Sequence, residues 1–578
     1  MPLDLTNHPG PLSPTDANLQ DVLEDLQGNI LNGHGRDQAI HVFMRFEPDR
    51  IVAVKKCIAA LATGWITSAK AQLEASEAFK RTGKDDGLFV HFALSGAGFT
   101  ALATAADKMP AGAALRRRSP TVEVNGQAVP FYDAGIFASG MKARRGLLQD
   151  PPIDEWDASF RGAIDAVIIV ADDSNIDLLN AEKRIREIFE TDSATPLARI
   201  VGVERGFGLR RRFYTGEGNP KFGENVEHFG YVDGRSQPAL LDTQLEADRQ
   251  RDGINIWNPV AAPSLVLLQD PNGTPNVSFG SFLVFRKLEQ DVRGFKRAQR
   301  ELAAELKLPL KLVGAMAVGR FEDGTPVVLQ PGDDSQPPVP NDFDYSSDKA
   351  GLRCPFHAHV RKTNPRGESV DPTGSFAQDL EEERGHRIAR RGIPYGGRIS
   401  NFDDIEMLPE RGVGLLFMCY QSDIWEQFEF QQRFWSNNDK FLQPGLRGTA
   451  EGAPDYLLNT GMDAIIGQQD ARTLDPLTGF AAPPTKWPCE WGKQTALTTH
   501  SIARFVKMRG GEYFFSPCIS YLKGLAAAPK EMAEPPKDLY SAELDKLSER
   551  IGDSRRAPSI PFFASLCGTE RAQPVSGH

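Results

Sequence analysis

The sequence predicts an α+β fold made of two similar halves. Short apolar runs alternate with stretches in which apolar residues recur every three or four positions, and these are the periods of buried strands and of helices that pack on a sheet. The alternation occurs twice, and a polar, glycine-rich stretch at residues 215–225 separates the two rounds. Two rounds of this pattern indicate two ferredoxin-like halves, each an antiparallel sheet with helices packed on it.

Composition bounds what the chain can do. It has 578 residues, of which 40 % are hydrophobic and 25 % charged, enough for two packed domains. The net charge of -11 argues against a nucleic-acid or anionic-membrane partner. Six scattered cysteines without a CxxC pair favour reduced thiols. The N-terminus does not resemble a signal peptide and no apolar run reaches the roughly 20 residues of a membrane helix. We therefore expect a cytoplasmic protein without a membrane partner, and the oligomeric state stays open.

The first half follows a proline-rich leader, residues 1–22, and is predicted to span residues 23–220. Its predicted strands are residues 41–46, 88–94 and 163–171, and its predicted helices are residues 52–75, 99–105 and 176–190. The third strand is almost continuously apolar, as expected for a strand that is covered on both faces.

The second half is predicted to span residues 221–525, with an extended tail at 526–578. Its predicted strands are residues 281–285 and 414–420, its predicted helices are residues 290–306 and 424–435, and the tail holds one further possible helix at residues 541–551. Long polar insertions occupy residues 240–263, 323–350 and 437–482. Such loops are uncommon unless they cover a site or extend a surface.

One stretch in the second half concentrates turn residues around an acid. It reads EHFGYVDGRSQP, residues 227–238, with Asp233 between Gly230 and Gly234. Glycine accepts backbone conformations that other residues avoid and allows close approach, so the turn is suited to presenting Asp233 to another group. The alternative is an Asx-type turn in which Asp and Gly serve only the chain reversal.

Two further stretches offer a metal ligand and a cation. Residues 354–366, CPFHAHVRKTNPR, contain His357 and His359. Imidazole is a frequent metal ligand, although a lone histidine is more often a packed core or surface residue. Residues two apart in an extended segment point to the same side, so geometry does not choose between the two. Residues 386–396, HRIARRGIPYG, form a basic cluster that a solvated surface would also explain.

Together these strings resemble the GxxDG, AHIRKxNPR and RxGxPYG-like motifs of dye-decolorizing peroxidases. Recognisable pieces of that family run from about Leu26 to Leu522. The resemblance implies haem b in the C-terminal half, with His359 as the iron ligand and Asp233 over the opposite, distal face. It also implies that Arg390 projects beside Asp233 and that Arg366 pairs with a haem propionate.

Asp423 has two interpretations. It lies in YQSDIWEQFEFQQRFW, residues 420–435, which resembles the family's segment behind the proximal histidine. There Asp423 would bind near the cofactor by accepting the second imidazole proton, which raises ligand basicity. Alternatively it caps the helix that follows, because aspartate is favoured at that position.

The resemblance implies a haem-dependent peroxidase. Its substrates would be hydrogen peroxide and small aromatic reductants such as dyes and phenols, oxidised in one-electron steps. Two alternatives remain at this point. One is a haem-handling protein on the same scaffold, either a deferrochelatase or a carrier. The other is an α+β interaction protein that holds no haem.

Overall fold

The computed structural model describes most of the chain. The described residues are 4–83, 87–112, 121–124, 127–130, 135–190, 196–214, 220–233, 235–333, 339–369, 380–399, 401–439, 441–442, 460–468, 485–493, 497–500, 502 and 504–526. The tail from residue 527, with its predicted helix at 541–551, and much of the insertion at 437–482 lie outside these residues.

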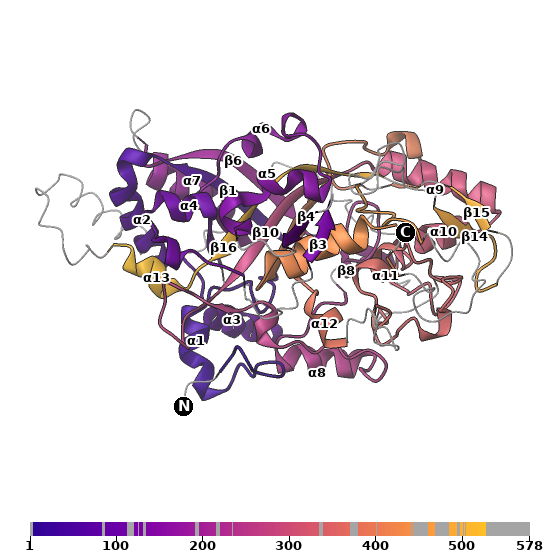
Figure 1. Cartoon of the computed structure of the whole chain (residues 1–578), viewed down its shortest axis with the longest axis horizontal. Coiled ribbons are helices and arrows are strands. Elements are labelled where there is room, and N and C mark those ends of the chain that lie inside the picture. The colour runs from indigo at the N-terminus through magenta and orange to yellow at the C-terminus, as the bar shows by residue number, and fades with distance from the viewer. Residues whose placement is uncertain are drawn as a thin grey trace, which may run out of the picture.

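A single antiparallel sheet organises the molecule (Figure 1), with its strands in the order β11-β13-β10-β16-β2-β5-β1-β6. In the first half the elements are β1 (Gln38–Phe46), α2 (Ile51–Gly64), α3 (Ala69–Thr82), β2 (Phe89–Ser95), β5 (Ala166–Asp172), α7 (Asn175–Glu190) and β6 (Ala198–Phe207). The four strands of this half are, in chain order, β1, β2, β5 and β6. In the sheet they lie in the order four, one, three, two, which is the ferredoxin-like arrangement.

The second half repeats that arrangement. Its elements are β10 (Phe279–Gln290), α9 (Val292–Leu306), β11 (Ala389–Arg390), β12 (Ile393–Tyr395), β13 (Gly414–Gln421), the π-helices η8 (Ile424–Glu429) and η9 (Gln431–Ser436), and β16 (Val506–Ser516). Here β16, β10, β13 and the short strands β11 and β12 again follow the order four, one, three, two.

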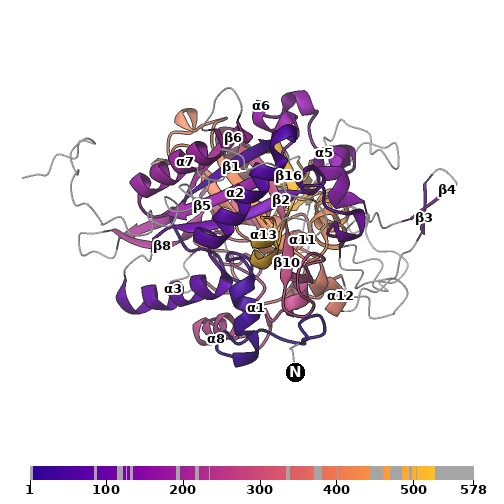
Figure 2. The same ribbon diagram turned by 90° about the vertical axis from the view of Figure 1, so that its left-hand side faces the viewer.

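Other elements surround this frame. They are α1 (Gln20–Asp25), α4 (Gly96–Ala101), β3 (Thr121–Val124), β4 (Gln127–Pro130), α5 (Ile136–Leu148), α6 (Ala158–Arg161), β7 (Leu209–Tyr214), β8 (Pro220–Val226), α8 (Asp242–Arg251), β9 (Leu268–Gln269), α10 (Leu310–Val318), α11 (His359–Thr363), α12 (Leu380–Gly385), β14 (Lys486–Pro488), β15 (Leu497–Thr499) and α13 (Ile519–Gly524). Helices α1, α3 and α8 lie together along the lower edge of the molecule in both views, as Figure 2 also shows. In the described residues no helix is both long enough and apolar enough to cross a membrane.

The two halves share one sheet because β16 pairs with β2, through Phe515 opposite Leu94 and Phe514 opposite Ser95. The buried side chain of Gln27 strengthens this joint. Its amide nitrogen donates to the carbonyl of Phe92 at 2.8 Å and to the carbonyl of Pro517 at 2.7 Å. One core cluster accordingly extends across both halves.

The leader and the boundary between the halves are more integrated than separate units would be. Leu5, Leu12 and Leu19 of the leader are buried in the shared core. The predicted boundary at residue 220 falls at the first residue of β8, which pairs with β7 in a hairpin. The residue limits of the domains stay a prediction.

Three helix predictions differ from the structure. The predicted helix at 99–105 is α4, which spans Gly96–Ala101 and ends before Leu102. The predicted helix at 52–75 is two helices, because α2 ends at Gly64 and α3 begins after Ser68, whose hydroxyl accepts from the Ala71 N–H. Between them, the N–H of Thr67 bonds to the carbonyl of Val90 in β2. The predicted helix at 424–435 is the π-helical pair η8 and η9, a form that is often found at functional sites.

Candidate functional site

A cavity in the second half brings the predicted site residues together. His359, Asp233 and Arg390 all line it. Its other walls are largely apolar and include Leu288, Val318, Leu415, Phe417, Phe428, Ile465, Ile466 and Val506. These side chains come from β10, α10, β13, η8 and β16 and from the insertion at 437–482. An apolar cavity with a few convergent polar groups is the usual form of a ligand site.

The acid turn is built as the glycines of the motif predict. The chain reverses between Val226 and Val232, which form an isolated bridge, and the N–H of Asp233 donates to the carbonyl of Asn225 at 2.8 Å. Gly230 has φ of +96°, the left-handed region that glycine accepts readily. Gly234 lies outside the described residues. The turn thus carries Asp233 to the cavity wall.

Glu227 holds the same turn from behind. Its carboxylate accepts hydrogen bonds from the N–H of Phe229 at 2.7 Å and from the N–H of Tyr231 at 3.0 Å, and the side chain of Gln290 also donates to it. Burial raises the pKa of Glu227 to about 7, although these hydrogen bonds oppose the rise. Sequence reasoning missed Glu227, which opens the quoted motif.

Arg390 reaches Asp233 from the sheet. Its backbone belongs to β11, opposite Cys419 of β13, and one guanidinium nitrogen lies 2.5 Å from the Asp233 carboxylate. Another donates to the carbonyl of Arg235 at 3.0 Å. The neighbouring Arg391 turns away and donates to the carbonyls of Asn29 and Ile30. The basic cluster is therefore not a solvated charged surface.

His359 meets a carboxylate on its far side. The ring Nδ1 donates to the carboxylate of Asp463 at 2.8 Å, which leaves Nε2 as the ring nitrogen free for a ligand in the cavity. Burial alone would lower the pKa of His359, but the negative charge and hydrogen bond of Asp463 outweigh burial and raise it. Burial likewise opposes ionisation of Asp463, yet His359 and two backbone N–H groups hold its pKa below the ordinary value.

His357 lies elsewhere, and the assumption of an extended segment was wrong. The chain turns at residues 355–358, and His359 is the first residue of α11. The two rings therefore do not share a side. His357 is buried edge-on against Trp487, with ring centroids 4.2 Å apart, and does not line the cavity.

Asp423 is not the partner of the imidazole. Its carboxylate accepts from the N–H groups of Trp425 and Glu426 and caps η8, so the helix-cap interpretation is correct. Asp463 takes the place expected for Asp423. Asp463 lies about a hundred residues from His359 in an insertion whose local sequence gives no sign of that contact, so sequence reasoning could not find it.

Arg366 does not line the cavity either. Its guanidinium donates to the carbonyls of Asn341 and Phe343 and to the hydroxyl of Ser236, and it stacks on the Phe343 ring at 3.8 Å. Arg366 is therefore not placed to contact a ligand in the cavity directly. It acts on the wall through Ser236, which does line the cavity.

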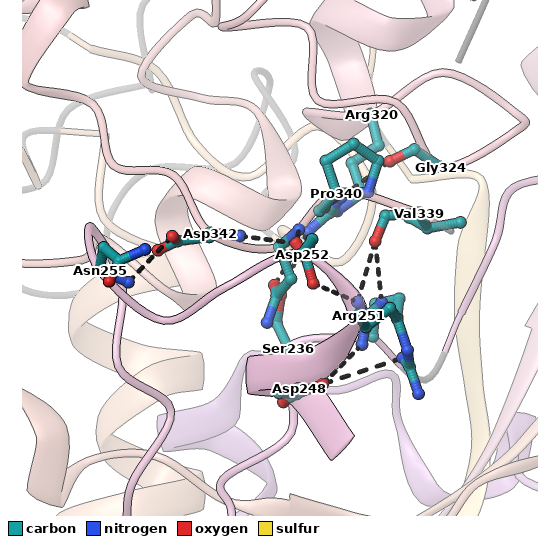
Figure 3. A network of polar contacts seen from close by, with 12 residues as sticks. Ser236, Asp248, Arg251, Asp252, Asn255, Arg320, Gly324, Val339, Pro340 and Asp342 are labelled. Carbon is teal, nitrogen blue, oxygen red and sulfur yellow. Dashed lines mark hydrogen bonds and ion pairs between the residues drawn. The ribbon is translucent and has the colours of Figure 1, made fainter. Parts of the chain in front are cut away.

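Arg320 and Arg235 line the cavity instead, within a polar network that joins two of the insertions (Figure 3). Arg235 pairs with Asp248 and Asp252 of the insertion at 240–263. Asp252 in turn accepts from the backbone of the insertion at 323–350, at Asn341 and Asp342. Both insertions thus support the cavity wall at Arg235, through Asp248 and Asp252 in one and the carbonyl of Val339 in the other.

This network leaves positive charge at the cavity wall. Arg320 donates to the carbonyls of Gly324 and Pro340 and to Ser236 and Asn341, all neutral oxygens. Burial and the nearby charge of Arg366 lower the pKa of Arg320 to about 9. Among the described residues, Arg320 has no carboxylate partner, so an anionic group in the cavity would complete its pairing.

The donor set fits haem. An imidazole backed by a carboxylate suits an axial iron ligand, and the apolar walls suit a flat macrocycle. Arg320, which has no carboxylate partner among the described residues, suits a carboxylate side chain of that macrocycle. A carboxylate and guanidinium, Asp233 with Arg390, lie in the same cavity as His359.

Known proteins resemble this chain in both sequence and fold. The multifunctional dye peroxidase DyP2 of Amycolatopsis sp. is 37 % identical over 534 residues, covering 91 % of this chain and 100 % of that protein. The dye-decolorizing peroxidase msp1 of Mycetinis scorodonius is 30 % identical over 423 residues, covering 68 % of this chain and 71 % of that protein. No protein-family model matches the chain.

Solved structures agree. The DyP-type peroxidase AnaPX of Anabaena sp. superposes with a TM-score of 0.74 at 36 % identity and covers 90 % of this chain and 99 % of its own. The structure of DyP2 gives a TM-score of 0.74 at 35 % identity, covering 90 % of this chain and 100 % of its own. These likenesses confirm the predicted α+β fold and the resemblance that the motifs carry. The chain belongs to the dye-decolorizing peroxidase family.

Proposed function

We propose that the chain binds haem b through His359 and uses it to reduce hydrogen peroxide at the expense of small aromatic reductants. The observation that carries the proposal is the convergence of two pairs, His359 with Asp463 and Asp233 with Arg390, in one apolar cavity. Arg320 and Arg235 would hold the haem propionates, and Arg366 would support the same wall through Ser236.

When bound, haem would supply an iron that reacts with peroxide and exchanges single electrons. Asp233 takes the proton from the peroxide oxygen that binds and delivers it to the other oxygen, so that this oxygen leaves as water. General acid–base catalysis of this kind is typically worth about 10²–10⁴ in rate. Arg390 balances the negative charge of Asp233 and of the separating oxygens.

The electron balance fixes the demand for reductant. Reducing one hydrogen peroxide to two water molecules takes two electrons and two protons. Two reductant molecules supply these, each losing one electron and one proton. Asp463 keeps the imidazole ring of His359 oriented and raises its basicity as an iron ligand.

Asp233→Asn tests the proposal. The amide keeps the size of the side chain and its place beside Arg390 but cannot accept a proton, so we expect a loss of about 10²-fold or more in kcat/KM for peroxide with full haem content. Stopped-flow absorbance of the haem band after mixing with peroxide measures this. Asp423→Asn is the matched control, because Asp423 caps η8 outside the cavity lining, and should react like the wild type. A wild-type rate for Asp233→Asn would refute the role given to Asp233.

Turnover separates the peroxidase from a haem-handling protein. A peroxidase oxidises dye in proportion to peroxide over many cycles and keeps its haem, whereas a deferrochelatase releases iron from it. Counting dye oxidised per haem, alongside free iron, distinguishes the two. The cytoplasmic location rests on sequence alone and stays a prediction.

A further inference from the structure

A second cavity adjoins the first and shares a wall with it. Asp233, Arg235, Ser236, Pro238 and Arg390 line both. The second cavity is bounded by the chain segment at residues 29–37, by helix α8 and by the segment at residues 390–394. A molecule in this second cavity would therefore lie against the Asp233–Arg390 pair, which also lines the first cavity.

Helix α8 borders this cavity and contributes no buried residue to a core. None of its residues is buried, and it is polar on every side. Its residues at positions 244, 247, 248 and 251 line the cavity, the spacing of one helix face. Gln244 fixes that face by donating to the carbonyl of Leu31, and Asp248 does so by pairing with Arg235.

The cavity is positively charged although the chain carries a net charge of -11. Its lining contains six arginines and three aspartates; these are Arg36, Arg210, Arg235, Arg251, Arg390 and Arg391, with Asp37, Asp233 and Asp248. Such a concave patch concentrates anions near it.

Two of these arginines are not neutralised. Arg391 donates only to the carbonyls of Asn29, Ile30 and Arg390 and has no carboxylate partner among the described residues. Within the described part of the chain, Arg251 has one carboxylate contact, Asp248 at 3.8 Å, and Asp248 already pairs with Arg235 at 3.1 Å. Burial lowers the pKa of Arg391 only to about 10, so it stays cationic at neutral pH.

We propose that the second cavity is a binding site for the reductant, and that it selects small aromatic anions, namely phenols that carry a carboxylate. The inference rests on the proposed peroxidase function. The carboxylate of the substrate lies toward Arg251 and Arg391, and its phenol lies toward the shared wall at Arg390. Each bound phenol gives one electron to the haem site and one proton to solvent, and leaves as a phenoxyl radical.

The test compares 4-hydroxy-3-methoxybenzoate with its neutral amide, 4-hydroxy-3-methoxybenzamide, as reductants of the haem-loaded protein. Arg251→Gln should raise KM for the acid about fivefold, leave KM for the amide within twofold, and leave kcat and the kcat/KM for peroxide unchanged. Arg251→Lys should keep KM for the acid near the wild-type value, because lysine retains the positive charge. Arg249→Gln is the matched control, because Arg249 lies on the same helix, pairs with Glu246 and does not line the cavity.

A binding measurement complements the kinetics. Isothermal titration with the non-oxidisable ions benzoate and benzenesulfonate should show binding that Arg251→Gln weakens about fivefold, and benzamide should bind more weakly to the wild type. Equal changes for acid and amide, or equal effects of Arg249→Gln and Arg251→Gln, would overturn the proposal. A wild type that oxidises neither phenol would instead count against the peroxidase function, while the titration would still decide whether the cavity prefers anions.

Discussion

At the scale of single residues, two aspartates with similar surroundings serve different purposes. Asp423 and Asp463 are both buried, and each accepts two backbone N–H groups at the start of a turn or helix. Asp463 alone also accepts the imidazole proton of His359. A carboxylate at that position raises the basicity of the imidazole, so under the proposed function Asp463 would tune the iron ligand, while Asp423 stabilises a helix.

Asp463→Asn should weaken haem binding about 10- to 100-fold and raise the reduction potential of the iron, because the amide is a poorer acceptor for the Nδ1 proton. Haem transfer to a competing apoprotein and a redox titration measure the two effects. Asp423→Asn should change neither, since asparagine is also a good helix cap. Equal effects of the two substitutions would show that the contact with His359 is unimportant.

His359→Ala should give a protein that retains little haem, or haem whose spectrum recovers when imidazole is added. His357→Ala should bind haem normally, although it removes the contact with Trp487 and should cost about 1–3 kcal/mol of stability. Haem content per polypeptide decides between them. A colourless His357→Ala with a coloured His359→Ala would reverse the assignment.

At the scale of elements, the acid turn depends on a partly buried carboxyl group. Glu227 accepts from two backbone N–H groups of the turn, at Phe229 and Tyr231, and thereby fixes the loop that ends at Asp233. Burial raises the pKa of Glu227 most, and the negative charge of Asp233 adds to the rise. The contribution of Glu227 to the stability of the folded protein therefore depends on pH.

The sign of that dependence follows from the pKa of about 7 in the folded protein, against 4.5 ordinarily. Between about pH 4.5 and 7 the folded state keeps a proton that the unfolded state has released, so stability falls as pH rises, by about 3 kcal/mol in total. Glu227→Gln should remove this slope. Urea unfolding at pH 5 and pH 7.5 measures it, with the exposed Glu246→Gln as control, and an unchanged slope in Glu227→Gln would contradict the assignment.

At the scale of the whole molecule, the continuous sheet makes the two halves one folding unit. Strand β16 of the second half pairs with β2 of the first, and Gln27 bonds to backbone groups of both halves. Without its partner, each half would expose a sheet edge and part of the shared core. We expect a single cooperative transition for both halves.

Gln27→Leu should lower the free energy of unfolding by about 3 kcal/mol, because it leaves the buried carbonyls of Phe92 and Pro517 without their donor. Tryptophan fluorescence and the haem band, followed in one urea titration, should shift together. The exposed Gln250→Leu should leave both midpoints in place. Two separate transitions would show that the halves fold independently.

The sequence by itself determined the features that depend on local pattern. Strand and helix periods predicted the α+β class and its repetition, because burial on one face imposes those periods. Contiguous motifs located Asp233, His359 and Arg390, since the turn, the helix start and the strand that position them are each encoded within a few residues.

Only the tertiary structure decided which distant groups meet. Asp463 contacts His359 although the two residues are 104 positions apart in the chain. Arg320, and not Arg366, lines the cavity. The second cavity exists because α8 and Arg391, far apart in the chain, come to line the same space. Such contacts are set by the packing of the shared core and by the hydrogen bonds between insertions, neither of which leaves a periodic trace in the sequence.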